Sequence, residues 1–212
     1  MTALAEEGDA YYRRNKEQHE PEYDPIIDII DDLGFTSVLE IGSVNGWRLA
    51  GLQERYGCKV EGVEASGLAV AEHRVRYPDI PVVQGIAPNI LTVLPDNAYD
   101  LVICGFMMYL LPRDSLFQFA AEVDRILKYG GHILIEDFLA PNPHSRDYTH
   151  RPDLRVYKHD PSSPWTWTPT YTLLDRRLVK HHAHVVDHSD PNRWIVTDLI
   201  RKLPEAHAYP GK

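Results

Sequence analysis

Short apolar runs rich in β-branched residues alternate with helical patterns along the first two-thirds of the chain, and no other feature limits the fold as strongly. The runs predict strands at Thr36–Ile41, Lys59–Val63, Pro81–Gln84, Tyr99–Cys104 and His132–Asp137. The patterns between them predict helices at about Trp47–Tyr56, Leu68–Tyr77 and Asp114–Leu127. Strands that alternate with helices pair in parallel, because each helix carries the chain back across the sheet. The fold class is therefore α/β, with a doubly wound and mostly parallel sheet.

The two ends of the chain extend this arrangement. Helices are expected at Ala5–His19 and Pro25–Leu33, since Pro25 suits a first helical turn and Gly34 suits a helix end. Near the other end, Tyr171–His182 and Arg193–Arg201 predict an antiparallel strand pair that completes a seven-stranded sheet.

The stretch from residue 138 to residue 169 has a different character. It is rich in Pro, His, Trp and Ser, and it follows the strand that the Gly130-Gly131 pair introduces at the end of the preceding helix. It is typical of a long ordered loop, and a loop of this length in a compact domain usually carries function. We therefore expect a helical cap or lid at residues 1–24 and a single domain at residues 25–212, in which residues 138–169 form a substrate-side loop.

Composition excludes several classes of partner. The formal net charge of −9 argues against nucleic acid, because a phosphate backbone selects basic surfaces. No apolar run is long enough to span a membrane, and the acidic start MTALAEEGDA has no signal-peptide pattern. Cys58 and Cys104 lie in different expected strands and fit a reducing compartment. We expect a cytoplasmic protein with no membrane partner, and a homodimer is compatible with the sequence.

Charge is unevenly distributed along the chain. No Lys or Arg occurs between Lys16 and Arg48, while that interval holds eight acids. Residues 144–184 hold seven Lys or Arg against four acids, together with six of the eleven histidines. A basic region on an acidic protein favours a small anionic ligand, although a solvated charged face explains the same residues equally well.

The segment VLEIGSVNGWRL, residues 38–49, joins the first of the five alternating strands to a helix through a glycine loop. Ligands of open parallel sheets bind beyond the carboxyl ends of the strands, so this loop is an expected ligand site. It has no Gly-Lys-Ser/Thr for a P-loop. The spacing of Gly42 and Gly46 also differs from the G-x-G-x-x-G of a dinucleotide site.

The loop instead resembles motif I of class I S-adenosylmethionine-dependent methyltransferases, whose usual form is E/D-x-G-x-G-x-G. LPDNAYDLVICGFMMYL and AEVDRILKYGGHILIEDF resemble the later motifs of that family, so the resemblance covers about residues 36–137. It implies a Rossmann-like methyltransferase fold with S-adenosyl-L-methionine as cofactor. In such a fold Glu40 faces the ammonium group of the cofactor, and Glu64 at the end of the second strand accepts the ribose hydroxyls.

The resemblance implies a set of cofactor-binding residues around these motifs, namely Glu40, Gly42, Ser43, Asn45, Gly46, Glu64, Ala65, Gly85, Ile86 and Gly105. Two positions depart from the family pattern. Val44 replaces the middle glycine, which is acceptable if its φ stays negative. Ile86 stands where an acid often contacts the adenine amine, so adenine would be held by apolar contact and backbone groups.

The basic segment HRPDLRVYKHD and the N-terminal GDAYYRRN supply residues for a substrate. Together they resemble a small-molecule subgroup of the family that occurs in surface-polysaccharide clusters and in phosphonate antibiotic pathways, including the phosphonate O-methyltransferase of dehydrophos biosynthesis. The substrate-side residues expected to act in catalysis are His150, Arg151, Arg155, Lys158, Tyr11 and Arg14. Arginines would grip an anion in a bidentate manner, whereas pairing with nearby aspartates is an equally good reading.

Three functions are compatible with these residues. The first is methylation of a small anionic phosphonate or phosphate oxygen, which is already ionised and needs only positioning. The second is methylation of a sugar hydroxyl, with His150 or His159 as the base. The third is a non-catalytic subunit of the same fold. The His-rich segment 180–188 has no familiar metal-ligand spacing, so no metal is expected.

Overall fold

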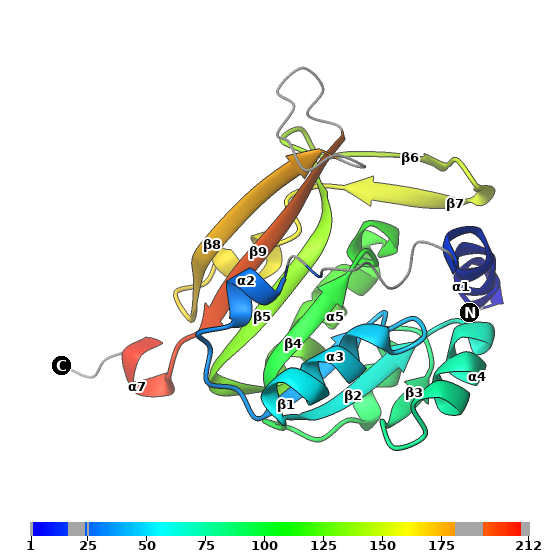
Figure 1. Cartoon of the computed structure of the whole chain (residues 1–212). Coiled ribbons are helices and arrows are strands. Elements are labelled where there is room, and N and C mark those ends of the chain that lie inside the picture. The colour runs from blue at the N-terminus through cyan, green and yellow to red at the C-terminus, as the bar shows by residue number, and fades with distance from the viewer. Residues whose placement is uncertain (1, 17–23, 25, 181–192, 209–212) are drawn as a thin grey trace.

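The computed structural model describes residues 2–16, 24, 26–180 and 193–208 (Figure 1). Its centre is a seven-stranded sheet with the order β3-β2-β1-β4-β5-β9-β8. The first five of these strands are parallel, β9 is antiparallel to β5, and β8 is antiparallel to β9. A separate two-stranded antiparallel sheet, β6-β7, follows β5 in the chain.

The strands of the main sheet are β1 (Ser37–Ile41), β2 (Lys59–Glu64), β3 (Val82–Gln84), β4 (Tyr99–Gly105), β5 (Leu127–Leu139), β8 (Tyr171–Lys180) and β9 (Trp194–Lys202). Those of the small sheet are β6 (His144–Tyr148) and β7 (Arg151–Lys158). The α-helices are α1 (Thr2–Asn15), α2 (Ile27–Ile30), α3 (Trp47–Tyr56), α4 (Gly67–Arg76), α5 (Arg113–Ile126), α6 (Ser163–Thr166) and α7 (Glu205–Ala208), and the 3-10 helices are η2 (Asn89–Val93) and η3 (Met108–Leu110).

Both faces of the sheet are covered, which is why its central strands are apolar at successive positions. Along a strand, neighbouring side chains point to opposite faces. Val38 packs with α2 and α3 residues in one core cluster, whereas the next residue, Leu39, packs with α5 residues such as Phe119 in the other. β1 is therefore buried on both sides, as a parallel strand between two helical layers should be.

The strand order reverses between β1 and β4, because the chain runs outward from β1 to β3 and then returns to β4. Such a switch point leaves a crevice at the carboxyl ends of the two strands. The β6-β7 sheet projects from the end of β5, and α1 lies beside α4 and contacts β7 (Figure 1). These two elements, far apart in the sequence, enclose the crevice.

The α/β class, the mostly parallel seven-stranded sheet and the antiparallel final pair are confirmed. The reading of residues 138–169 as a loop is wrong, since β6, β7 and α6 occupy most of it. The Gly130-Gly131 pair does not end a helix either. α5 stops at Ile126, and Gly130, with a φ of 80°, lies inside β5 where the pairing with β4 shifts register.

Two helices differ in length from the expectation. The helix expected at Pro25–Leu33 is only Ile27–Ile30, and the N-terminal helix is Thr2–Asn15, with residues 17–19 of its expected range outside the described residues. None of the described helices is both long and apolar enough to span a membrane.

Candidate functional site

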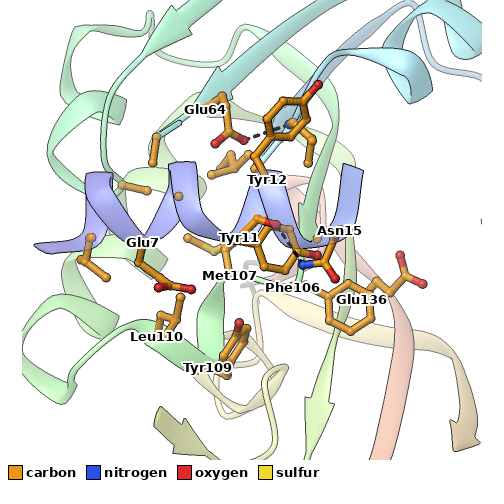
Figure 2. Close-up of a pocket in the computed structure, with 18 of the residues that line it drawn as sticks. Glu7, Tyr11, Tyr12, Asn15, Glu64, Phe106, Met107, Tyr109, Leu110 and Glu136 are labelled. Atoms are coloured by element: carbon orange, nitrogen blue, oxygen red, sulfur yellow. Dashed lines mark hydrogen bonds between the residues drawn. The ribbon is translucent and has the colours of Figure 1, made fainter. Parts of the chain in front are cut away.

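A cavity of about 1570 Å³ lies at the switch point, lined by the carboxyl ends of the parallel strands, by α1 and by the β6-β7 sheet (Figure 2). Ligand pockets commonly measure roughly 300–1,000 Å³. This cavity is larger than that range, so it can hold two small molecules together. It is the expected place for a cofactor and a substrate in an open α/β sheet.

The glycine loop after β1 forms part of the wall. Gly42 has a φ of 86°, and a Cβ at this position would lie 3.1 Å from the carbonyl oxygen of Gly105. Val44 has a φ of 51°, so the expectation of a negative φ is wrong. A β-branched residue is strained in this region of backbone space. The Val44 N–H donates to Glu64 Oε2 at 2.9 Å, and this bond helps to hold the strained loop.

Asn45 and Gly46 do not line the cavity, in contrast to the prediction. Asn45 is buried and lies close to Tyr12 of α1 and Glu72 of α4. Gly46 has a φ of 81°, and a Cβ there would lie 2.4 Å from His73 Nδ1. The second glycine of the motif is therefore required by the packing of α3 against α4, and not by contact with a ligand.

Glu40 is one of three carboxylates that surround a single arginine, Arg48, in a largely buried cluster. Arg48 Nη1 donates to Glu40 Oε1 at 3.0 Å, its Nε donates to Asp24 Oδ2 at 2.6 Å, and its Nη2 donates to Glu136 Oε2 at 3.2 Å. One guanidinium does not neutralise three carboxylates, so the cluster has an excess of negative charge when all are ionised. Burial raises the pKa of Glu40 to about 7, although Arg48 opposes the rise.

Asp24, Arg48 and Glu136 were missed by the sequence prediction, although all three line the cavity. The sequence does contain one indication of this cluster. Arg48 is the first Lys or Arg after Lys16 in an otherwise acidic stretch. A lone cation in such a stretch indicates a partner among the acids. Which acids it meets depends on how β5 and the N-terminal segment pack around α3.

Glu64 lies where the resemblance places it, at the end of β2 in the cavity wall. Its Oε1 accepts the N–H of Ser66 at 2.7 Å in addition to the bond from Val44. Burial raises the pKa of Glu64, and these backbone bonds oppose the rise. Its neighbours Ala65, Gly85, Ile86 and Gly105, predicted from the resemblance, also line the cavity.

The opposite wall, formed by β6, β7, the turn between them and the start of β9, is basic. Its charged or titratable lining residues are His144, Arg146, His150, Lys158 and Arg193, and none of its described lining residues is Asp or Glu. Lys158 is buried, with its Nζ 4.1 Å from the centre of the Phe138 ring. His150 packs edge-on against Tyr148 at 5.3 Å between ring centres.

Arg151 and Arg155 do not line the cavity. Arg151 pairs with Glu6 at 2.6 Å and with Asp153 at 2.9 Å, and Arg155 pairs with Asp147 at 2.8 Å. The expectation that they grip the substrate therefore disagrees with their position, because carboxylates already occupy both guanidinium groups.

Other aromatic and histidine residues of the 138–169 stretch also lie elsewhere. His159 is outside the lining, and its Nδ1 lies 2.8 Å from the carbonyl oxygen of Asp160. Trp165 is buried against Phe119, and Trp167 is 75% exposed, so neither indole walls the cavity.

Tyr11 of α1 lines the cavity (Figure 2), and so does Arg14 of the same helix. Arg14 Nη2 donates to the buried Glu7 at 2.5 Å and to Tyr148 Oη at 3.3 Å, so α1 is connected to β6. Burial raises the pKa of Tyr11 to about 12, which keeps its hydroxyl protonated at neutral pH.

The residues at the strand ends fit a cationic ligand with hydrogen-bonding groups. Glu40 Oε2 and Ser43 Oγ are buried, and neither has a hydrogen-bond partner among the described residues. A buried polar atom without a partner is costly, so a ligand that supplies a donor there is favoured. No group of three His, Cys, Asp or Glu within the described residues could hold a metal ion, and residues 181–188 of the His-rich segment lie outside them.

Comparisons with known proteins show what the chain is similar to. The family model of a methyltransferase domain matches residues 38–131. An uncharacterized protein of Haemophilus influenzae is 30% identical over 112 residues, which are 50% of this chain and 45% of that protein. The match therefore spans less than half the length of this curated relative.

Two solved structures illustrate how far the fold is shared. The 1,6-didemethyltoxoflavin-N1-methyltransferase of Burkholderia thailandensis, solved with 1,6-didemethyltoxoflavin and S-adenosylhomocysteine, has a TM-score of 0.74 at 15% identity, over 95% of this chain and 88% of that chain. The complex of DhpI with S-adenosylhomocysteine (SAH) has a TM-score of 0.56 at 18% identity, over 97% and 100%. Residues 38–131 thus match a methyltransferase domain, and the chain as a whole shares the fold of the Burkholderia thailandensis methyltransferase.

Proposed function

We propose that this protein transfers a methyl group from S-adenosylmethionine to an oxygen of a small anionic molecule, specifically a phosphonate or phosphate. The observation that carries this proposal is the division of charge in the cavity. Glu40, Glu64 and Glu136 line the strand-end side, whereas Arg146, Lys158 and Arg193 line the opposite side. A cationic cofactor fits the first side and an anionic acceptor fits the second.

Glu40, Ser43 and Glu64 would hold the cofactor through its polar groups, and Ile86 would contact the adenine. The unpartnered Oε2 of Glu40 is the natural acceptor for an ammonium group. When bound, S-adenosylmethionine supplies a methyl group on a sulfonium that leaves without acid catalysis. The residues of this chain therefore have to orient the acceptor and exclude water, and α1, which lines the cavity, would help to exclude it.

Lys158 is the residue best placed to orient the anion. It is buried, it lines the cavity, and a charge acts more strongly in a site with little water. An ionised phosphonate oxygen needs no base, so a positioned cation is sufficient. The resemblance of the basic segment to enzymes of phosphonate pathways supports the same substrate.

The proposal predicts that Lys158→Met raises the apparent KM for the anionic acceptor by at least about tenfold, since a hydrogen bond to a charged group contributes roughly 1.5–3 kcal/mol. Incubation of a pool of small phosphonates with methyl-labelled S-adenosylmethionine, followed by phosphorus NMR, detects the ester and its rate of formation. The matched control is Lys59→Met, at an exposed position where β2 begins. Both variants should bind S-adenosylhomocysteine normally, and equal turnover by both would contradict the assignment.

A second candidate is methylation of a sugar hydroxyl with a histidine base. It is favoured by the position of His150, which lines the cavity on the substrate side. A histidine base gives a rate that falls on the acid side of its pKa, whereas an ionised phosphonate oxygen loses less activity there. If no phosphonate ester forms, while S-adenosylhomocysteine binds and a His150→Ala variant loses turnover of sugars, the second candidate replaces the first. Failure to bind S-adenosylhomocysteine at all would favour a non-catalytic subunit.

A further inference from the structure

An aromatic surface adjoins the basic wall of the cavity. Ring contacts run without a break from Phe106 to Phe138 (5.8 Å between centres), to Tyr109 (5.1 Å), to Tyr148 (6.2 Å) and to His150 (5.3 Å). All five residues line the cavity. They come from β5, β6, the turn after β6, η3 and the segment between β4 and η3, so the fold assembles this surface from separate parts of the chain.

Phe106 shows that part of this wall is held under strain. Its φ is 46°, a conformation that bulky residues rarely adopt, and its N–H donates to the carbonyl oxygen of Glu136 at 2.7 Å. If Phe106 served only to fill the hydrophobic core, it could do so at a position that does not require this unfavourable φ. Strained residues that persist beside a cavity commonly serve the site, because the surrounding structure must hold them there.

α1 supplies an aromatic residue on the other side of the same space. Tyr11 lines the cavity from the face of α1 that looks inward, with Phe106 and Tyr109 also at the cavity (Figure 2). Burial is the main cause of the raised pKa of Tyr11, and Tyr148 and Glu64 add to the rise. Rings on two sides of a space favour a flat occupant that can stack or meet their edges.

We propose that the acceptor is a planar aromatic or heteroaromatic molecule that carries its anionic group next to the ring. Lys158 sits where both parts of such a molecule would meet, because its ammonium lies over the Phe138 ring on the same wall. The anionic group would contact the cations, and the flat part would lie against Phe106 and Tyr109. This inference rests on the proposed function and narrows its substrate class.

Four small molecules, tested for binding to protein saturated with S-adenosylhomocysteine, distinguish the effect of a flat ring from the effect of negative charge. Phenylphosphonate and cyclohexylphosphonate share the anion and differ in the ring, and benzyl alcohol and cyclohexylmethanol form the matching neutral pair. Ligand-observed NMR titration gives the dissociation constant of each. We expect phenylphosphonate to bind about tenfold more tightly than cyclohexylphosphonate, as one or two ring contacts would provide.

Substitutions at two aromatic residues test which part of the protein causes the preference for the flat phosphonate. Phe106→Leu should reduce the preference for the flat phosphonate to about twofold or less, while Phe117→Leu, at an exposed ring on α5 outside the cavity lining, should leave it unchanged. Lys158→Met should weaken both phosphonates by the same factor and neither alcohol.

The outcomes distinguish this inference from the function on which it rests. Equal binding of the two phosphonates, both weakened by Lys158→Met, overturns the planar acceptor and leaves the anionic one. Binding of benzyl alcohol in preference to cyclohexylmethanol, with no binding of either phosphonate, overturns the anionic acceptor and supports the aromatic surface. No binding of any probe overturns both.

Discussion

Two glycines of the loop after β1 serve different purposes. Gly42 lies at the cavity, where its φ of 86° and its closeness to Gly105 make any side chain unfavourable. Gly46 faces His73, a buried histidine of α4. The spacing of the two glycines predicted a tight loop correctly. It could not show which glycine meets a ligand, because His73 is distant in the sequence.

Gly46→Ala should therefore destabilise the fold without acting on the cofactor directly. The new Cβ would require both a positive φ, at about 1–2 kcal/mol, and displacement of the His73 ring, at about 1–3 kcal/mol. Urea denaturation should show a loss of at least about 2 kcal/mol in the free energy of unfolding. His73→Ala in the same chain should restore part of it.

Gly51→Ala is the matched control for this variant. Gly51 lies within α3 and a Cβ there meets nothing within 4 Å, so alanine should stabilise the helix by about 0.5–1 kcal/mol. An equal loss of stability in Gly46→Ala and Gly51→Ala would show that the helix, and not the contact with His73, determines the effect.

The N-terminal helix α1 is held in place by hydrogen bonds from two elements that are distant in the sequence. Asp9 Oδ1 accepts hydrogen bonds from Ser66 Oγ at 2.6 Å and from the N–H of Leu68 at 3.1 Å, which fix α1 to the start of α4. Arg151 of β7 contacts α1 from the other side, through Glu6 and through the carbonyl oxygen of Ala3 at 3.1 Å. Two distant elements thus hold α1 beside the cavity.

Arg151→Ala should loosen the start of α1 and leave the cavity chemistry intact. The contacts of Arg151 with α1 lie near the surface, where ion pairs are screened by solvent, so the global stability should change little. Hydrogen exchange of the first turns of α1 should become faster, by up to about fivefold. Cofactor affinity should stay the same.

Arg155→Ala provides the comparison, because its contacts stay within the β6-β7 sheet. It should not alter exchange in α1. If Arg151→Ala instead lowered substrate affinity while exchange in α1 stayed slow, Arg151 would bind the anion after all.

For the whole molecule, the cavity separates opposite charges across its width. The acidic side comes from the strand ends and the N-terminal segment, and the basic side comes from the β6-β7 sheet and β9. Asp24, Glu40 and Glu136 share one guanidinium, that of Arg48. Cys104 of β4 is also near Glu40, and its own pKa is raised by burial.

This arrangement makes cofactor binding depend on pH in a defined direction. The pKa of Glu40 is raised from its ordinary 4.5 to about 7, so the neutral carboxyl is favoured in the free folded protein. The contribution of Glu40 to the free energy of unfolding is fully present below about pH 4.5, the ordinary pKa of the group. It is lost as the pH rises through about 7, the pKa in the folded protein. A cationic cofactor prefers the ionised form and must displace the proton at lower pH.

The affinity for S-adenosylmethionine should therefore increase from pH 5.5 to pH 7, by at most about tenfold per pH unit for one proton. Titration calorimetry in two buffers with different ionisation enthalpies should show proton release on binding at pH 6. Glu40→Gln should bind more weakly with a flat profile over this range. A flat profile in the unaltered protein would place the cofactor cation away from Glu40.

The sequence by itself determined the α/β class, the strand alternation and the acids at the ends of β1 and β2, because these depend on local periodicity and short spacings. The β6-β7 sheet was not predicted from the sequence. Its register depends on cross-strand pairing, and its residues are too polar for a typical strand pattern. Only the tertiary structure decided that Arg151 and Arg155 pair with acids, and that Arg48, Phe106 and Lys158 meet at one cavity. Their meeting is a property of the packing of distant elements, which no local pattern encodes.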